Sequence, residues 1–162
     1  MNAQIVDSGI DRVKSARVVI EVPAAQIFAV IDNPHRHYEI DGSGMVKSNV
    51  TGPTELVLGS KFAVGMKQFG ISYKQFNKVV EYQKDELIAW NNLSPSIWRY
   101  ELRRINENST EVISSYDGRI PWFLRWYANY EFKWAPKALA ETLDRLKNLV
   151  ESNRPTSLEQ ES

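Results

Sequence analysis

The stretch PKALAETLDRLKNLVE, from Pro136 to Glu151, decides the class of fold. Its apolar residues recur at the spacing of one helix face, and charged residues fill the positions between them. The apolar positions are Leu139, Leu143, Leu146 and Val150. A proline suits the first turn of a helix, where its missing N–H costs nothing. We therefore expect a long amphipathic helix near the C-terminus, with one apolar stripe that needs a partner surface.

The region from Met45 to Asp117 has no helical period. Short runs alternate between apolar and polar residues, and turn signals such as Gly70 separate them. In SKFAVGMKQF, for example, Phe62, Val64 and Met66 fall on one face. Successive strands at short spacing predict an antiparallel meander.

The start of the chain predicts one strand and one helix. Met1–Ser15 has no steady period and is interpreted as an arm or an edge strand. ARVVIEV, Ala16–Val22, alternates as a strand does, and Pro23 ends it. AAQIFAVI, Ala24–Ile31, carries apolar residues at helical spacing and predicts a short helix.

These elements predict a single α+β domain over residues 1–152. The segment IPWFLRWYANYEFKW before the last helix is expected to be helical or to be a loop leading into it. A long amphipathic helix after such a sheet should lie across the apolar face of the sheet. If the sheet curves, helix and sheet enclose a space. Residues 153–162 form a polar tail that we expect to be disordered.

Composition excludes several classes of function. The 20 basic and 20 acidic residues balance, so nothing favours a nucleic-acid partner or an anionic membrane. There is no cysteine, and the N-terminus has no long apolar run, so no disulfide, signal peptide or membrane insertion is expected, and the default location is cytoplasmic. The 5 Trp and 7 Tyr favour a wide, partly wet core such as a ligand cavity.

Three stretches resemble a known superfamily: ARVVIEVPAAQIFAVIDNPHRHYEIDGSG, GISYKQFNKVVEYQKDELIAW and ALAETLDRLKNLVE. They look like the START and Bet v 1-like (SRPBCC) proteins, most of all the bacterial polyketide cyclase/dehydrase and lipid-transport-type branch. The resemblance implies a helix-grip fold, in which a curved antiparallel sheet wraps around a long C-terminal helix and encloses a cavity. It implies a fold rather than one function, since the branch holds both enzymes and binders.

The resemblance also implies which residues line that cavity. Strand alternation chooses the inward face, and a slip of one residue would invert it. The strand candidates are Met66, Tyr73, Asn77, Trp90, Trp98, Tyr100 and Tyr116, and the candidates from the aromatic segment are Trp122, Phe123, Trp126, Tyr127 and Tyr130. Asn77 and Tyr73 are expected to orient polar groups of a ligand.

The stretch PHRHYEID, Pro34–Asp41, contains both histidines of the chain. In an extended segment, His35 and His37 would point the same way as Glu39. No further His or Cys completes a metal shell, so no metal site is expected. We interpret the stretch as a polar loop at the cavity mouth, and an acid–base role for His37 remains the alternative.

Other motifs add little chemistry. The sequence has no G-x-S-x-G, dinucleotide or P-loop motif, and no cofactor is expected. The charges around Arg99 and Arg103 are interpreted as the outer face of the meander, with cross-strand ion pairs. Arg125 and Lys133 could pair with a ligand carboxylate, although surface charge is the commoner explanation.

The favoured function is binding of a small hydrophobic or aromatic molecule, lipid-like or polyketide-like, for transport or sequestration. The first alternative is a cyclase or dehydratase in which His37 or the hydroxyl of Tyr116 moves protons. The second is an interaction module, with the aromatic segment as a protein or homodimer surface.

Overall fold

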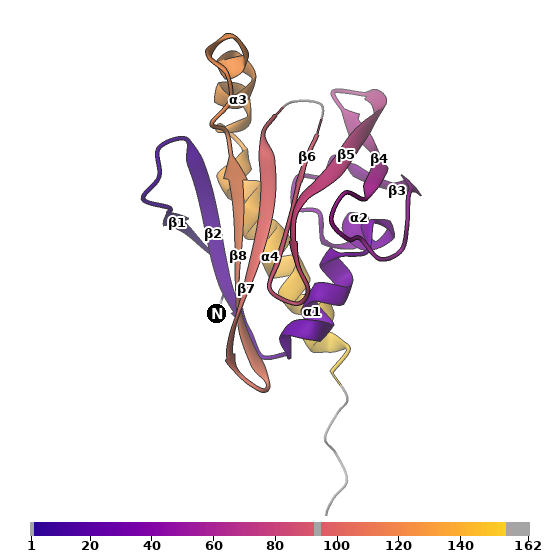
Figure 1. Cartoon of the computed structure of the whole chain (residues 1–162), viewed down its shortest axis with the longest axis vertical. Coiled ribbons are helices and arrows are strands. Elements are labelled where there is room, and N and C mark those ends of the chain that lie inside the picture. The colour runs from indigo at the N-terminus through magenta and orange to yellow at the C-terminus, as the bar shows by residue number, and fades with distance from the viewer. Residues whose placement is uncertain (1, 93–94, 155–162) are drawn as a thin grey trace, which may run out of the picture.

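Eight antiparallel strands form one sheet in the computed structural model, which describes residues 2–92 and 95–154 (Figure 1). Their spatial order is β1-β2-β8-β7-β6-β5-β4-β3. The strands are β1 (Gln4–Asp7), β2 (Val13–Ile20), β3 (Val46–Thr51), β4 (Lys61–Gln68), β5 (Ile71–Gln83), β6 (Leu87–Asn91), β7 (Ile97–Asn106) and β8 (Ser109–Asp117). The predicted antiparallel meander is confirmed.

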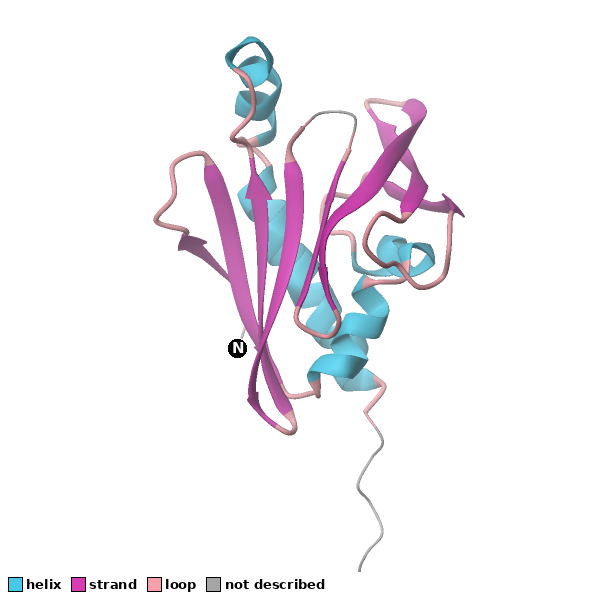
Figure 2. Ribbon diagram, in the orientation of Figure 1, coloured by secondary structure: helices cyan, strands magenta, loops and turns pink. Residues whose placement is uncertain are grey.

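The helical segments occur in two groups, one between β2 and β3 and one after β8 (Figure 2). They are α1 (Ala24–Ile31), η1 (Pro34–Arg36), α2 (His37–Ile40), η2 (Trp122–Leu124), α3 (Arg125–Glu131) and α4 (Ala135–Ser152). Among the described residues, no helix is both long and apolar enough to cross a membrane. The tail prediction for 153–162 falls mostly on residues 155–162, which lie outside the described part of the chain.

The predicted N-terminal elements are confirmed with one shift. The first residues contain the edge strand β1, and α1 has the expected bounds. Strand β2 begins at Val13, three residues before the expected start, and ends at Ile20 instead of Val22. Its early start follows from pairing with β8, where Val13 lies opposite Asp117. That partner is about a hundred residues away in the sequence, so the local period could not indicate it.

The interpretation of Pro34–Asp41 as a loop is wrong, because the segment forms η1 and α2. The side chain of Asn33 accepts a hydrogen bond from the backbone N–H of His35 (3.1 Å), which starts the helical turn. Pro34 occupies the first helical position, where proline is well suited. The helical turns also bury one side of the segment, including Ile40.

The stripe of α4 forms the centre of the core. Leu139, Leu143 and Leu146 are almost fully buried, and α4 packs mainly against β2, with further contacts to β8 and α2. A close contact ties the loop after α2 to the same helix. The backbone N–H of Gly42 donates to Thr142 Oγ1 (2.9 Å), and a Cβ on Gly42 would lie 2.5 Å from the backbone nitrogen of Thr142. Glycine is the residue that permits this approach.

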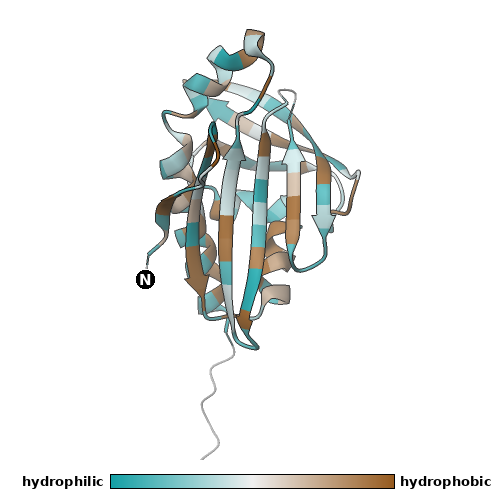
Figure 3. Cartoon of the chain, turned by 60° about the vertical axis from the view of Figure 1, so that its left-hand side comes forward, coloured by the Kyte–Doolittle hydropathy of each residue, from teal (hydrophilic) through white to brown (hydrophobic). Residues whose placement is uncertain are grey.

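Figure 3 shows hydrophobic and hydrophilic residues interspersed along the strands of the sheet. On β5 the two faces follow the predicted alternation. On β5, Tyr73, Gln75 and Asn77 face the space under α3 and α4, while Phe76 is exposed. On the outer face, both guanidinium contacts of Arg99 to the carboxylate of Glu81 measure 2.7 Å. The predicted ion pairs of the outer face are therefore present.

Candidate ligand cavity

A cavity of about 330 Å³ lies between the sheet, α2 and the α3–α4 region. Eight of the residues predicted for such a cavity line it: Met66, Tyr73, Asn77, Trp90, Trp98, Tyr100, Tyr127 and Tyr130. The strand residues among them come from β4 to β7, so a register assigned from alternation alone brings them together. Burial raises the pKa of Tyr100 to about 12, so this wall residue carries a neutral hydroxyl.

Three other candidates do not line the cavity. Trp122, Phe123 and Trp126 are 79%, 58% and 69% exposed, on η2 and α3, which project beyond the end of the sheet (Figure 1). Trp122 and Phe123 belong to η2, which precedes α3. Within α3, Tyr127 and Tyr130 fall on the inner side of the helix and Trp126 does not.

Tyr116 is fully buried behind the cavity wall rather than in it. Its ring packs against Trp98, with centroids 5.0 Å apart, and edge-on against Phe132. Its hydroxyl has no hydrogen-bond partner among the described residues. Burial raises the pKa of this hydroxyl, and the neighbouring Glu131 raises it further.

The two histidines have separate roles. His37 Nε2–H donates to the carbonyl oxygen of Ile31 (2.7 Å), and its ring stacks on Trp90 with centroids 5.0 Å apart. Burial lowers the pKa of His37 to about 4, so a neutral imidazole forms part of the cavity wall. His35 Nε2 instead contacts the carbonyl oxygen of Gly52 (2.9 Å), away from the cavity.

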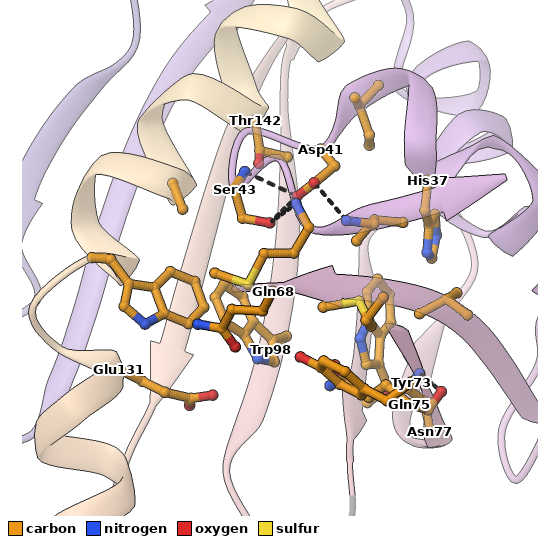
Figure 4. Close-up of a pocket in the computed structure, with 18 of the residues that line it drawn as sticks. His37, Asp41, Ser43, Gln68, Tyr73, Gln75, Asn77, Trp98, Glu131 and Thr142 are labelled. Atoms are coloured by element: carbon orange, nitrogen blue, oxygen red, sulfur yellow. Dashed lines mark hydrogen bonds between the residues drawn. The ribbon is translucent and has the colours of Figure 1, made fainter. Parts of the chain in front are cut away.

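Asp41 is a cavity residue whose hydrogen bonds are already made. One carboxylate oxygen accepts from the backbone N–H (3.0 Å) and the hydroxyl (2.7 Å) of Ser43. The other accepts from the backbone N–H of Val46 (3.0 Å), as Figure 4 shows. This carboxylate therefore holds the start of β3 in place. No group of three or more His, Asp or Glu residues positioned for a metal ion occurs in residues 2–92 and 95–154.

Glu131, at the end of α3, is the important residue that the sequence prediction missed. It lines the cavity, is only 5% exposed, and its Oε2 has no hydrogen-bond partner among the described residues. Burial raises the pKa of its carboxyl group, and the hydroxyls of Tyr116 and Tyr127 partly oppose that effect. The signal was available, because 127, 130, 131 and 134 share one helical face, but the aromatic composition of the segment concealed it.

Two more buried polar atoms of cavity residues lack partners within the described chain. They are Asn77 Oδ1 on β5 and Trp134 Nε1 just before α4. Figure 4 shows Glu131 entering the site from the helical side and Asn77 from the sheet side. Buried polar groups are normally hydrogen-bonded, so a cluster of unsatisfied atoms around a cavity indicates a place for a guest.

Comparisons with known proteins give relatives without an assigned role. No family model matches the chain. It is 38% identical over 117 residues to the uncharacterized protein Rv0088 of Mycobacterium tuberculosis (strain H37Rv), and equally to MT0096 of strain CDC 1551. Each match covers 72% of this chain and 52% of the relative. The chain thus spans about half the length of the curated relatives it matches.

Solved structures share the architecture at low sequence identity. A protein from Rhodobacter sphaeroides has a TM-score of 0.69 at 14% identity, covering 93% of this chain and 99% of that one. Ms6760 from Mycobacterium smegmatis also reaches 0.69, at 10% identity, over 93% and 100%. The Aha1 dimer from Colwellia psychrerythraea reaches 0.57 at 16% identity, over 87% and 97%. These likenesses show a shared α+β antiparallel-sheet fold.

Proposed function

We propose that the protein binds a small, mostly apolar or aromatic molecule in its central cavity, for transport or sequestration. The observation that carries the proposal is the cavity itself. Its volume of about 330 Å³ falls in the range of small-molecule sites. Its wall combines aromatic rings with a few polar atoms that have no partner in the described chain. That combination suits an apolar guest with one or two polar groups.

We further propose that the fold is the helix-grip fold of the START and Bet v 1-like class. The strand order, the short helices between β2 and β3, and the position of α4 across β2 and β8 support this assignment. So does the cavity between the sheet and the helices after β8.

The enzymatic alternative has less support from the geometry. His37 Nε2 is engaged with a backbone carbonyl, and its ring packs in the wall. The hydroxyl of Tyr116 lies behind the wall. The Nε2–H of His37 is therefore committed to the backbone, and the Tyr116 hydroxyl does not line the cavity, which leaves Nδ1 of His37 as the group of these two residues that could exchange a proton with a guest.

A second candidate function is an interaction module, and the exposed cluster of Trp122, Phe123 and Trp126 favours it. Exposed aromatic patches mark interfaces more often than ordinary surface. Sedimentation velocity over a range of protein concentrations tests for a homodimer. A mass that stays that of one chain would count against self-association.

Filling the cavity should abolish binding without unfolding the protein. Ala138 lies on α4 and lines the cavity, so Ala138→Phe would place a ring in the space of the guest. We expect the affinity for the neutral fluorescent probe N-phenyl-1-naphthylamine to fall more than tenfold. Fluorescence titration of each protein with the probe measures this affinity.

The matched control is Lys137→Phe, which adds the same ring one position earlier on the exposed side of α4. This variant should bind the probe as the wild type does. If wild type fails to bind the probe, or if Ala138→Phe binds it as tightly as wild type, the cavity is not the binding site.

A further inference from the structure

Two unsatisfied polar atoms at one end of the cavity, an acceptor and a donor, belong to residues that line it, and the unsatisfied hydroxyl of Tyr116 lies behind the wall near Glu131. The acceptor is Glu131 Oε2 and the donor is Trp134 Nε1, both buried and both from residues that line the cavity. The backbone N–H of Trp134 donates to the carbonyl oxygen of Glu131 (3.1 Å), so a single helical turn joins the two residues. The side chains therefore leave the chain on the same side.

The charge of the wall restricts the guest. Its ionisable groups include two carboxyls, from Asp41 and Glu131, and no Lys or Arg lines the cavity within the described chain. The carboxylate of Asp41 already accepts hydrogen bonds from Ser43 and Val46, and the imidazole of His37 is neutral. An anionic guest would be buried without a positive partner and would meet Glu131, and burying such a charge is costly.

We propose that the cavity takes a neutral apolar or aromatic molecule bearing a hydroxyl group, which donates to Glu131 Oε2 and accepts from Trp134 Nε1. A hydroxyl is both donor and acceptor, so it is the smallest group that satisfies both atoms. A carboxylate offers no hydrogen to Glu131 Oε2 and would be buried in a wall without Lys or Arg among the described residues. An ammonium offers no acceptor to Trp134. This inference rests on the proposed binding function and names its ligand class.

A matched ligand series tests the inference by isothermal titration at pH 7.5. The ligands are 2-naphthol, 2-methoxynaphthalene, 2-naphthoate and 2-naphthylmethylamine, which share one ring system and differ in the polar group. Wild type should bind 2-naphthol at least tenfold more tightly than each of the other three. Glu131→Gln keeps the size of the side chain but replaces its carboxyl group with an amide. In this variant the ratio of the affinity for 2-naphthol to the affinity for 2-naphthoate should fall about tenfold.

The control variant is Gln75→Glu, which adds a carboxylate on the sheet side of the same cavity. It should weaken naphthoate binding further and keep the preference for naphthol over methoxynaphthalene. Equal affinities for naphthol and methoxynaphthalene would overturn the inference, and so would a ratio unchanged in Glu131→Gln. If 2-naphthylmethylamine binds more tightly than 2-naphthol, an ion pair decides the preference. That result would also overturn the inference.

The same data separate this inference from the proposed function. If all four ligands bind with affinities that Ala138→Phe abolishes but without the expected order, the cavity binds guests and the hydroxyl assignment is wrong. If none of them binds, and N-phenyl-1-naphthylamine does not bind either, the proposed function fails and this inference fails with it.

Discussion

Leu143→Ala should lower the free energy of unfolding by about 3–4 kcal/mol, because it removes a side chain with no exposed surface from the centre of the α4 stripe. Leu143 belongs to the buried cluster that joins α4 to the sheet and α1, so the void left by the substitution has little freedom to collapse. Urea unfolding followed by circular dichroism measures the change, and the midpoint should fall at constant slope.

The same substitution on the surface provides the control. Leu58 lies in the loop before β4 and is 64% exposed, so Leu58→Ala should change the free energy of unfolding by less than about 0.5 kcal/mol. If Leu143→Ala costs no more than Leu58→Ala, α4 is not packed across the sheet as described. The cavity beside it would then have no fixed wall.

His37 should make the stability depend on pH between about 6.5 and 4. Its pKa is about 4 in the folded protein, against an ordinary value of 6.5, because the ring is buried. Between these values the unfolded chain binds a proton that the folded protein does not. Stability is therefore fully present above about pH 6.5 and is lost as the pH falls towards 4. A difference of this size corresponds to about 3 kcal/mol.

The measurement is the difference in unfolding free energy between wild type and His37→Gln at pH 7 and at pH 4. Relative to the wild type, His37→Gln should be more stable at pH 4 than at pH 7 by about 3 kcal/mol. Taking a difference matters because burial raises the pKa of Asp32 to about 6, which acts in the opposite direction in both proteins. A pH-independent difference would mean that the imidazole is not buried neutral.

The elements themselves were predictable because their signals are local. The apolar stripe from Leu139 to Val150 predicted α4, and alternation on β5 predicted that Tyr73 and Asn77 share a face. Each of these patterns depends only on residues a few positions apart in the sequence, within one or two helical turns or within one strand. Alternation placed six of the seven strand candidates on the face that lines the cavity, whereas the cavity itself and the contribution of the aromatic segment were implied by the family resemblance.

The candidates that do not line the cavity were misplaced because their positions depend on tertiary packing. Trp122 and Trp126 appeared suited to a cavity by composition, yet η2 and α3 extend past the sheet and leave them exposed. Tyr116 was placed on the correct strand face, but Phe132 and Trp98 cover it. Side-chain type does not indicate which part of a helix reaches the sheet.

By itself, the sequence determined the antiparallel meander, the faces of the strands, the first helix and the amphipathic last helix, since periodicity is a property of neighbouring residues. Only the tertiary structure decided that His37 packs neutral against Trp90 and that Glu131 enters the cavity with a free carboxylate oxygen. Both results depend on burial, and burial depends on segments far apart in the chain. The chemistry of the site is therefore a consequence of long-range packing around residues that look ordinary in the sequence.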